Sequence, residues 1–119
     1  MDAYVKSAQF MKTLAHPVRL SILNLLRDGE VCVCHLEAAL DQRQAYISQQ
    51  LAQLRAAGLV EDRREGWRIY YHVTRPQVFE IIDAVGHLMG YDRQRQPRTV
   101  LDDCSCPACE FTRGNGGLT

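Results

Sequence analysis

The chain has 119 residues, of which 46% are hydrophobic, and its 14 basic and 14 acidic side chains give a formal net charge of zero at pH 7. This length predicts a single domain with one core, and no apolar run approaches the length of a membrane span, which excludes an integral membrane protein. The N-terminal stretch lacks the apolar centre of a signal peptide, so we expect a cytoplasmic protein with no membrane partner.

The first quarter of the chain predicts two helices. Apolar residues at helical spacing indicate a helix over residues 3–14, which His16 and Pro17 interrupt. Pro17 suits the first turn of a second helix, because a backbone N–H would have no helical partner at that position. Asp28 and Gly29 end the second helix. Two helices separated by a short break therefore precede the first cysteines.

Residues 30–58 predict a second pair of helices, joined by a tight turn. A short third helix runs into the turn at residues 41–43, and a fourth helix over residues 44–57 stops at Gly58. Arg43 directly precedes the fourth helix, but its side chain has no hydrogen-bond acceptor, so we expect Asp41 to cap that helix. This arrangement is typical of a helix-turn-helix.

The apolar spacing then changes to that of strands. Residues 59–63 and 68–73 predict two strands, and Glu65 and Gly66 supply the turn between them. After Thr74, which we expect to be an N-cap, a last helix begins around Pro76 and carries a wide aliphatic stripe. The predicted order is α-α-α-α-β-β-α, a mainly α fold with a small β-hairpin. A helix pair followed by an arginine-rich hairpin indicates a winged helix-turn-helix.

The fourth helix and the hairpin predict a protein that binds double-stranded DNA. In a helix-turn-helix the early residues of the second helix meet base edges in the major groove; here they are Gln44, Ala45, Tyr46, Ser48 and Gln49. The hairpin residues expected to reach phosphates are Arg63, Arg64 and Arg68. The alternative is a solvated polar helix beside an ordinary hairpin, but the ordered combination favours DNA binding.

The five cysteines form two groups, Cys32 with Cys34 and Cys104 with Cys106 and Cys109. An odd number of cysteines without a secretion signal argues against a disulfide framework and favours metal-binding or redox-active thiols. Thiolates prefer soft ions, and the start of a helix, where Cys32 and Cys34 are expected, lowers the pKa of a thiol. No C-x-x-C motif at a strand–helix junction and no catalytic triad are present, so we do not expect an enzyme.

Three stretches resemble the ArsR/SmtB family of metal-responsive winged-helix repressors: LAHPVRLSILNLL at residues 14–26, GEVCVCHLEAAL at 29–40 and the segment 44–73. The resemblance implies a homodimer whose first and last helices form the interface, and an operator DNA as partner. The E-x-C-V-C segment at 30–34 is similar to the metal site of arsenite-sensing and cadmium/lead-sensing members. It implies As(III), Sb(III), Cd(II) or Pb(II) as inducer, without an organic cofactor or a small-molecule substrate.

Two cysteines on one helix are too few for a tight site, because a trigonal As(III) or Pb(II) site needs three sulfur ligands. Arsenite sensors similar to this segment can take a third cysteine one turn later, where this chain has Glu37. We therefore expect Cys104, Cys106 or Cys109 to supply the rest, or to form a separate three-sulfur pocket, whereas His35 is expected to be a surface residue.

The sequence leaves the signal open between a metal and a redox change. Cys34 and one of the later cysteines could instead form a disulfide or polysulfide, giving a redox or sulfide sensor of the same fold. In domain terms, we expect residues 1–92 to form the DNA-binding and dimerisation domain and residues 93–119 to form a flexible cysteine-containing C-terminal tail.

Overall fold

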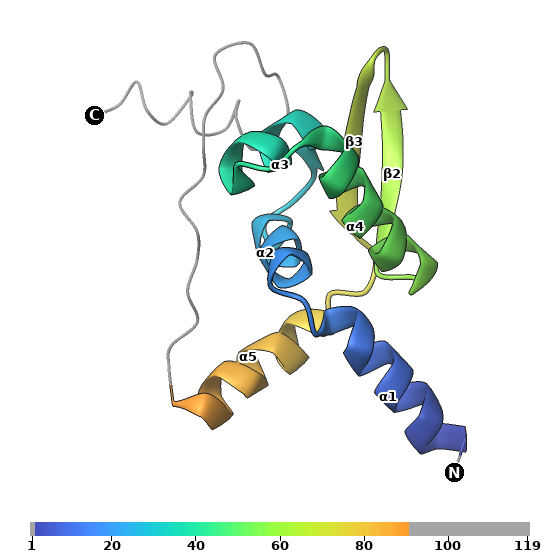
Figure 1. Ribbon diagram of the computed structural model, residues 1–119, viewed down its shortest axis with the longest axis vertical. Helices are drawn as coiled ribbons and strands as arrows, with labels where there is room; N and C mark the ends of the chain where they lie inside the picture. Colours follow the sequence, from blue (N-terminus) through green and yellow to red (C-terminus); the bar gives the residue numbers. More distant parts are fainter. Residues whose placement is uncertain (1, 91–119) are drawn as a thin grey trace.

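The computed structural model describes residues 2–90, and these form five helices and a small antiparallel sheet (Figure 1). The elements in chain order are α1 (Asp2–Leu14), α2 (Pro17–Leu25), β1 (Val31–Cys32), α3 (Val33–Leu40), α4 (Gln44–Ala56), β2 (Val60–Glu65), β3 (Arg68–Val73) and α5 (Val78–Met89). The winged helix-turn-helix predicted from the sequence is confirmed. The expectations for residues 93–119, including Cys104, Cys106 and Cys109, lie outside the described residues.

In the break between the first two helices, His16 forms the N-cap of α2. Pro17 occupies the first turn of α2 as predicted, and the Val18 N–H donates to Nδ1 of His16 at 3.1 Å. The imidazole thus satisfies one of the backbone donors that every helix leaves open at its start. The two helices therefore meet at a defined angle rather than through a loose linker.

Two predicted N-caps are wrong. Asp41 does not cap α4; it ends α3 in a left-handed conformation with φ of 51°, and its N–H donates to the carbonyl of Glu37. Aspartate tolerates this conformation better than most residues, which explains its place in the tight turn. Thr74 does not cap α5, which begins at Val78, beyond Pro76. Instead, the Thr74 hydroxyl donates to the Gly58 carbonyl at 2.8 Å and closes the base of the hairpin.

The sheet has one strand more than the sequence predicted. Its order is β1-β3-β2, with Cys32 opposite Tyr70 and Arg64 opposite Ile69. The strand β1 has only two residues, too few for a period-2 pattern to show in the sequence. Its pairing with β3 fixes the segment before Cys34 to the wing, the hairpin formed by β2 and β3.

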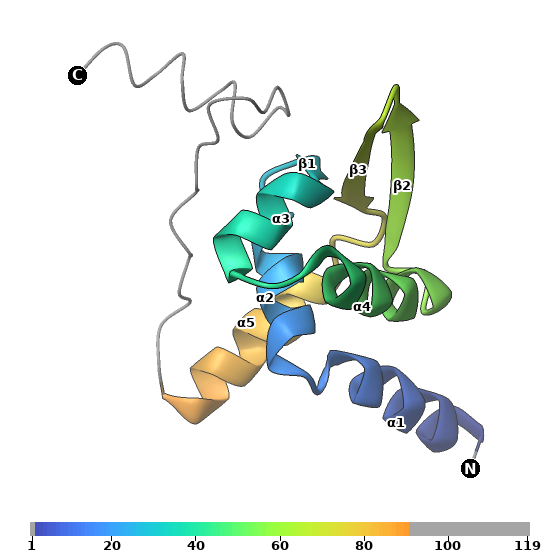
Figure 2. The same cartoon turned by 45° about the horizontal axis from the view of Figure 1, so that its top comes forward.

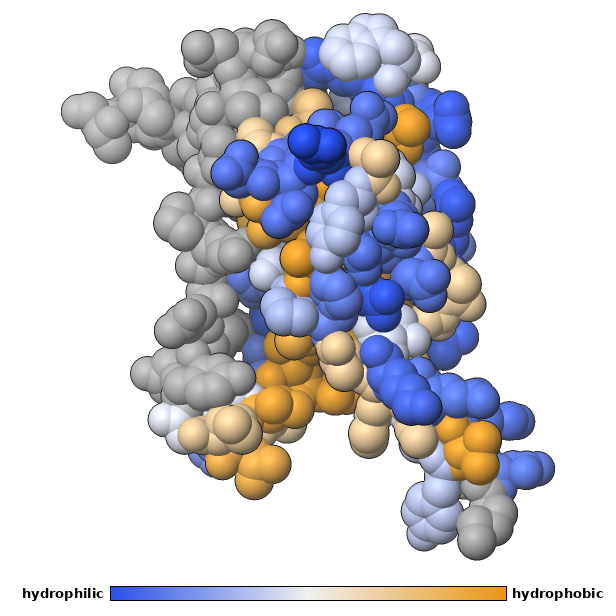
Figure 3. Space-filling view, viewed as in Figure 1, coloured by the Kyte–Doolittle hydropathy of each residue, from blue (hydrophilic) through white to orange (hydrophobic). Residues whose placement is uncertain are grey.

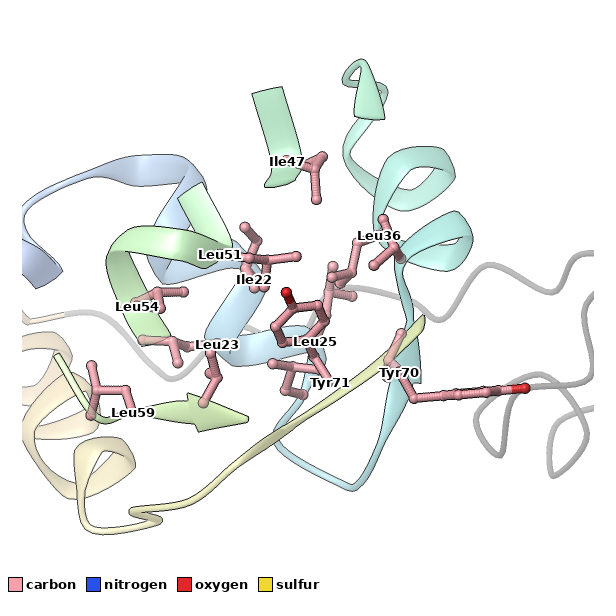
Figure 4. Packing of buried hydrophobic residues seen from close by; sticks show 14 of the residues in the cluster. Ile22, Leu23, Leu25, Leu36, Ile47, Leu51, Leu54, Leu59, Tyr70 and Tyr71 are labelled. Carbon is pink, nitrogen blue, oxygen red and sulfur yellow. The ribbon is translucent and has the colours of Figure 1, made fainter. Parts of the chain in front are cut away.

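The core lies between α2, α3, α4 and the sheet. Side chains of α2 and α4 point toward one another, and the ring of Tyr71 on β3 closes the space between them (Figure 4). Ile22, Ile47 and Leu51 are 0% exposed. Because the inner face of α4 is completely covered, its polar residues are held on the outside at fixed positions.

Helices α1 and α5 extend away from this core (Figure 2). Of the aliphatic stripe on α5, Val78 belongs to the core, but Val85 is 48% exposed and Leu88 is 83% exposed. An apolar area covers α5 and its junction with the core, in contrast to the hydrophilic upper face (Figure 3). Within residues 2–90, no helix is long and apolar enough to cross a membrane.

Candidate DNA interface and thiol pocket

The outer face of α4 carries most of the residues predicted to meet bases. Gln44, Ala45, Ser48 and Gln49 are exposed, whereas Ile47, on the opposite face, is 0% exposed. The first turns of α4 therefore present two amides and a hydroxyl to solvent, the donor and acceptor types that pair with base edges in a major groove.

Tyr46, also predicted to meet DNA, is half-buried and contacts the N-cap of α2. Its hydroxyl lies 3.4 Å from Nε2 of His16. Because Nδ1 of His16 accepts from the backbone, the neutral ring carries its proton on Nε2 and donates to the tyrosine oxygen. The contact ties the start of α4 to the break between α1 and α2.

A second link of this kind involves Gln50, which was not among the residues predicted to form the site. Its side chain is 6% exposed, and its Oε1 accepts from Nε of Arg19 at 2.9 Å. Arg19 also donates from Nη1 to the Thr13 carbonyl at the end of α1. The position of Gln50 next to Leu51, on the side of α4 that carries the buried Ile47, is the sequence signal that could have revealed it.

In the wing, Arg63 is held by acidic side chains. It donates to both carboxylate oxygens of Glu30, at 3.0 and 2.6 Å, and to Glu65 at 2.7 Å, and its guanidinium lies 4.6 Å from the ring centroid of Tyr70. The hydrogen bonds to Glu30 and Glu65 raise the pKa of Arg63 above its ordinary value. Arg63 thereby connects the wing to the residue before β1.

The other two wing arginines have different surroundings. Arg64 is exposed, and Arg68 is half-buried with its guanidinium 4.8 Å from the ring centroid of Trp67. Trp67 itself, which was not among the residues predicted to form the site, is 80% exposed. A single tryptophan beside a turn glycine is the signal that could have drawn attention to it.

The cysteine pair lies where the sequence placed it, at the start of α3. Cys32 is 1% exposed and occupies the N-cap position, and Cys34 is half-buried. Both border a pocket of about 170 Å³. Its other lining residues come from three elements and the wing turn: Val33, Glu37, Gln44, Trp67, Arg68 and Ile69. The pocket thus lies between the cysteine helix, the first residue of α4 and the wing.

The donors in this pocket fit a soft ion only in part. Cys32 and Cys34 offer two sulfurs and Glu37 a carboxylate, but among residues 2–90 no three histidine, cysteine or acidic side chains are grouped closely enough to hold a metal. The prediction that His35 lies at the surface is wrong, since it is 1% exposed. His35 and the adjacent Leu36 are both buried, so this side of α3 faces the core.

Comparison with known proteins identifies relatives of this fold and sequence. A family described as bacterial regulatory protein, arsR family, matches residues 16–62. The chain is 46% identical over 78 residues to the biofilm growth-associated repressor of Agrobacterium fabrum, covering 66% of this chain and 67% of the relative. It is 44% identical over 73 residues to the arsenical resistance operon repressor of Escherichia coli, covering 60% and 62%.

A solved structure agrees with these matches. The homodimeric winged helix-turn-helix DNA-binding domain Mb0332 from Mycobacterium bovis superposes with a TM-score of 0.64 at 33% identity. The match covers 78% of this chain and 91% of that one. Sequence and fold therefore lead to the same group of DNA-binding regulators.

Proposed function

This chain belongs to the arsR family of bacterial regulatory proteins, and we propose that it is a cytoplasmic homodimeric repressor that leaves its operator DNA when a thiophilic ion binds to its cysteines. The observation that carries the proposal is the composition of one pocket: Cys32 and Cys34 share it with Gln44 and the wing. An ion bound to the thiols would therefore lie next to both parts of the proposed DNA interface, the start of α4 and the wing.

The DNA-binding part of the proposal rests on the outer face of α4 and on the wing. Gln44, Ala45, Ser48 and Gln49 are exposed and read bases, and the half-buried Tyr46 positions the helix through His16. Arg64 and Arg68 anchor phosphates. Arg63 contributes to DNA binding only if it exchanges its contacts with Glu30 and Glu65 for phosphates.

The dimer part of the proposal rests on the apolar faces of α1 and α5. A groove between them is lined by Met11, Leu14, Ala15, Leu20, Ile81, Ile82 and Val85. Exposed aliphatic faces of this width indicate a contact between subunits, and a two-fold axis lets each face cover its copy. The Mycobacterium bovis neighbour is described as homodimeric, which supports the same assembly here.

The inducer part of the proposal rests on the preference of thiolates for soft ions. Thiolates bind As(III), Sb(III), Cd(II) and Pb(II) in preference to hard ions. Cys32 and Cys34 supply two ligands, and we propose that Cys104, Cys106 or Cys109 complete the set. An Escherichia coli relative is described as an arsenical resistance operon repressor, which supports a metalloid as the signal.

The test compares a Cys34→Ser variant with a chain ending at Asp103, each bound to a labelled operator selected from random DNA. Cys34 is preferred to Cys32 for substitution because Cys32 is 1% exposed and packs in the core. Arsenite or cadmium, added anaerobically with a thiol-free reductant, is expected to release wild type and neither variant.

The pattern of failure locates the site. If only the truncated chain loses the response, the C-terminal cysteines form the site alone; if only Cys34→Ser loses it, they are dispensable. If both variants respond like wild type, the thiol-bound ion is not the signal and the proposal fails. Release by an oxidant or polysulfide but by no ion would favour the second candidate, a redox or sulfide sensor, for which the partly accessible Cys34 provides the reactive thiol.

A further inference from the structure

Trp67 lies at the tip of the wing, where its burial contributes little to the fold. Glu65 pairs with Arg68, so Gly66 and Trp67 form a two-residue turn, in which Gly66 adopts φ of +63°. Trp67 is 80% exposed. Tryptophan carries a large apolar ring with a polar N–H and is enriched at interfaces, so Trp67 is a candidate for a contact with another molecule.

The surroundings of Trp67 favour DNA as that molecule. The guanidinium of Arg68 lies 4.8 Å from its ring centroid, an arrangement that orients the ring and places a positive charge beside it. Arg64, in the second residue pair from the turn, is exposed. The wing extends beyond the rest of the described fold as a narrow hairpin (Figure 1). A narrow, positively charged tip with one apolar ring has the shape and charge to enter a DNA groove.

The same two side chains also border the thiol pocket. Trp67 and Arg68 line it from the wing, Cys32 and Cys34 line it from α3, and Gln44 lines it from α4. The pocket, of about 170 Å³, has room for several water molecules and so for an ion beside the two cysteines. The tip of the wing therefore borders both the thiol pocket and the surface that would enter a DNA groove.

We propose that Trp67 and Arg68 form a contact for which DNA and the inducer compete: the pair packs in a groove of the operator, or it closes over the thiol pocket when an ion is held there. This inference rests on the proposed function and adds its structural cause. A ligand shifts an equilibrium only through contacts that differ between the two states, and here the differing contact is the position of the wing tip. Because coupling is reciprocal, DNA weakens ion binding by the same factor.

The DNA part is tested with Trp67→Ala, Trp67→Phe and wild type on the labelled operator. Trp67→Ala is expected to weaken binding about tenfold, or about 1.4 kcal/mol, the scale of one aromatic contact. Trp67→Phe retains an apolar ring and is expected to recover most of this loss. Equal affinities for Trp67→Ala and wild type would overturn the DNA contact.

The ion part uses Trp67 as its own reporter, because the chain has one tryptophan. Acrylamide quenching of its fluorescence is measured for the wild type alone, with operator, with CdCl₂ and with sodium arsenite. Strong quenching is expected for the protein alone, and clear protection in the operator complex and with an ion that releases DNA. Cys34→Ser is expected to lose the ion-induced protection.

Two outcomes separate this inference from the proposed function. If an ion releases the wild type and Trp67→Ala by the same factor without protecting Trp67, the shared contact is overturned and the sensor function stands. If neither ion releases the wild type from DNA, the sensor function fails and the competition fails with it. Protection together with a smaller release factor in Trp67→Ala supports the inference.

Discussion

Replacing Val85 by aspartate tests whether the exposed face of α5 is a subunit interface. Val85 is 48% exposed in the single chain and borders the apolar groove between α1 and α5. Full burial of a valine side chain is worth about 1.5–3 kcal/mol, so covering the exposed half contributes about 1 kcal/mol in each subunit. A two-fold dimer contains two copies, which together contribute about 2 kcal/mol.

The new carboxylate adds an effect at least as large as that of the lost area. Placing a charged group on an apolar face that must be desolvated costs at least about 1 kcal/mol more per subunit, so the total loss is about 4 kcal/mol or more. Each 1.4 kcal/mol is tenfold in affinity, and the dimer dissociation constant should rise by about a thousandfold. Val85→Ala, which removes area without adding charge, should raise it by about tenfold.

Sedimentation velocity across a range of concentrations measures this effect. Ala38→Asp is the matched control, because it adds the same charge at an exposed alanine on α3, away from α1 and α5. A wild-type chain that is monomeric at micromolar concentration would refute the reasoning. So would Val85→Asp dimerising as tightly as Ala38→Asp. Circular dichroism confirms that each variant is folded.

The remaining predictions concern DNA contacts and stability. Gln49→Ala should cost about 1–3 kcal/mol on the selected operator and little on unrelated DNA; an unchanged preference would mean that α4 meets DNA in another register. Arg64→Ala should weaken binding to all sequences alike and reduce the salt slope by about 1, whereas an unaltered slope would remove this phosphate contact. Asp83→Ala should lower the free energy of unfolding in urea by about 2–3 kcal/mol, because the nearly buried Arg27 loses its two hydrogen bonds to Asp83, at 3.0 and 3.1 Å, and keeps only the one to Asn24 among its side-chain hydrogen bonds within the described residues. Glu80→Ala, an exposed change on the same helix, should stay within about 0.5 kcal/mol, and equal losses for the two would refute a specific role of the ion pair.

Local chemistry determined the helices, the wing and the outer face of α4. Pro17 after His16, the glycine after α4 and the change from helical to strand spacing are signals that act over a few residues, so the sequence alone predicts them. The same is true of the exposed Gln44 and Gln49, since a helix with one fully apolar side must expose the other.

Only the tertiary structure decided which side chains meet across the chain. The strand β1 exists because β3 is available to pair with it, and Thr74 closes the hairpin because Gly58 lies beside it. Arg63 binds Glu30, 33 positions earlier, and no spacing rule connects residues so far apart. The pocket that joins Cys34 to Trp67 likewise depends on how the wing packs against α3, because burial and pairing follow from positions in space that local sequence does not encode.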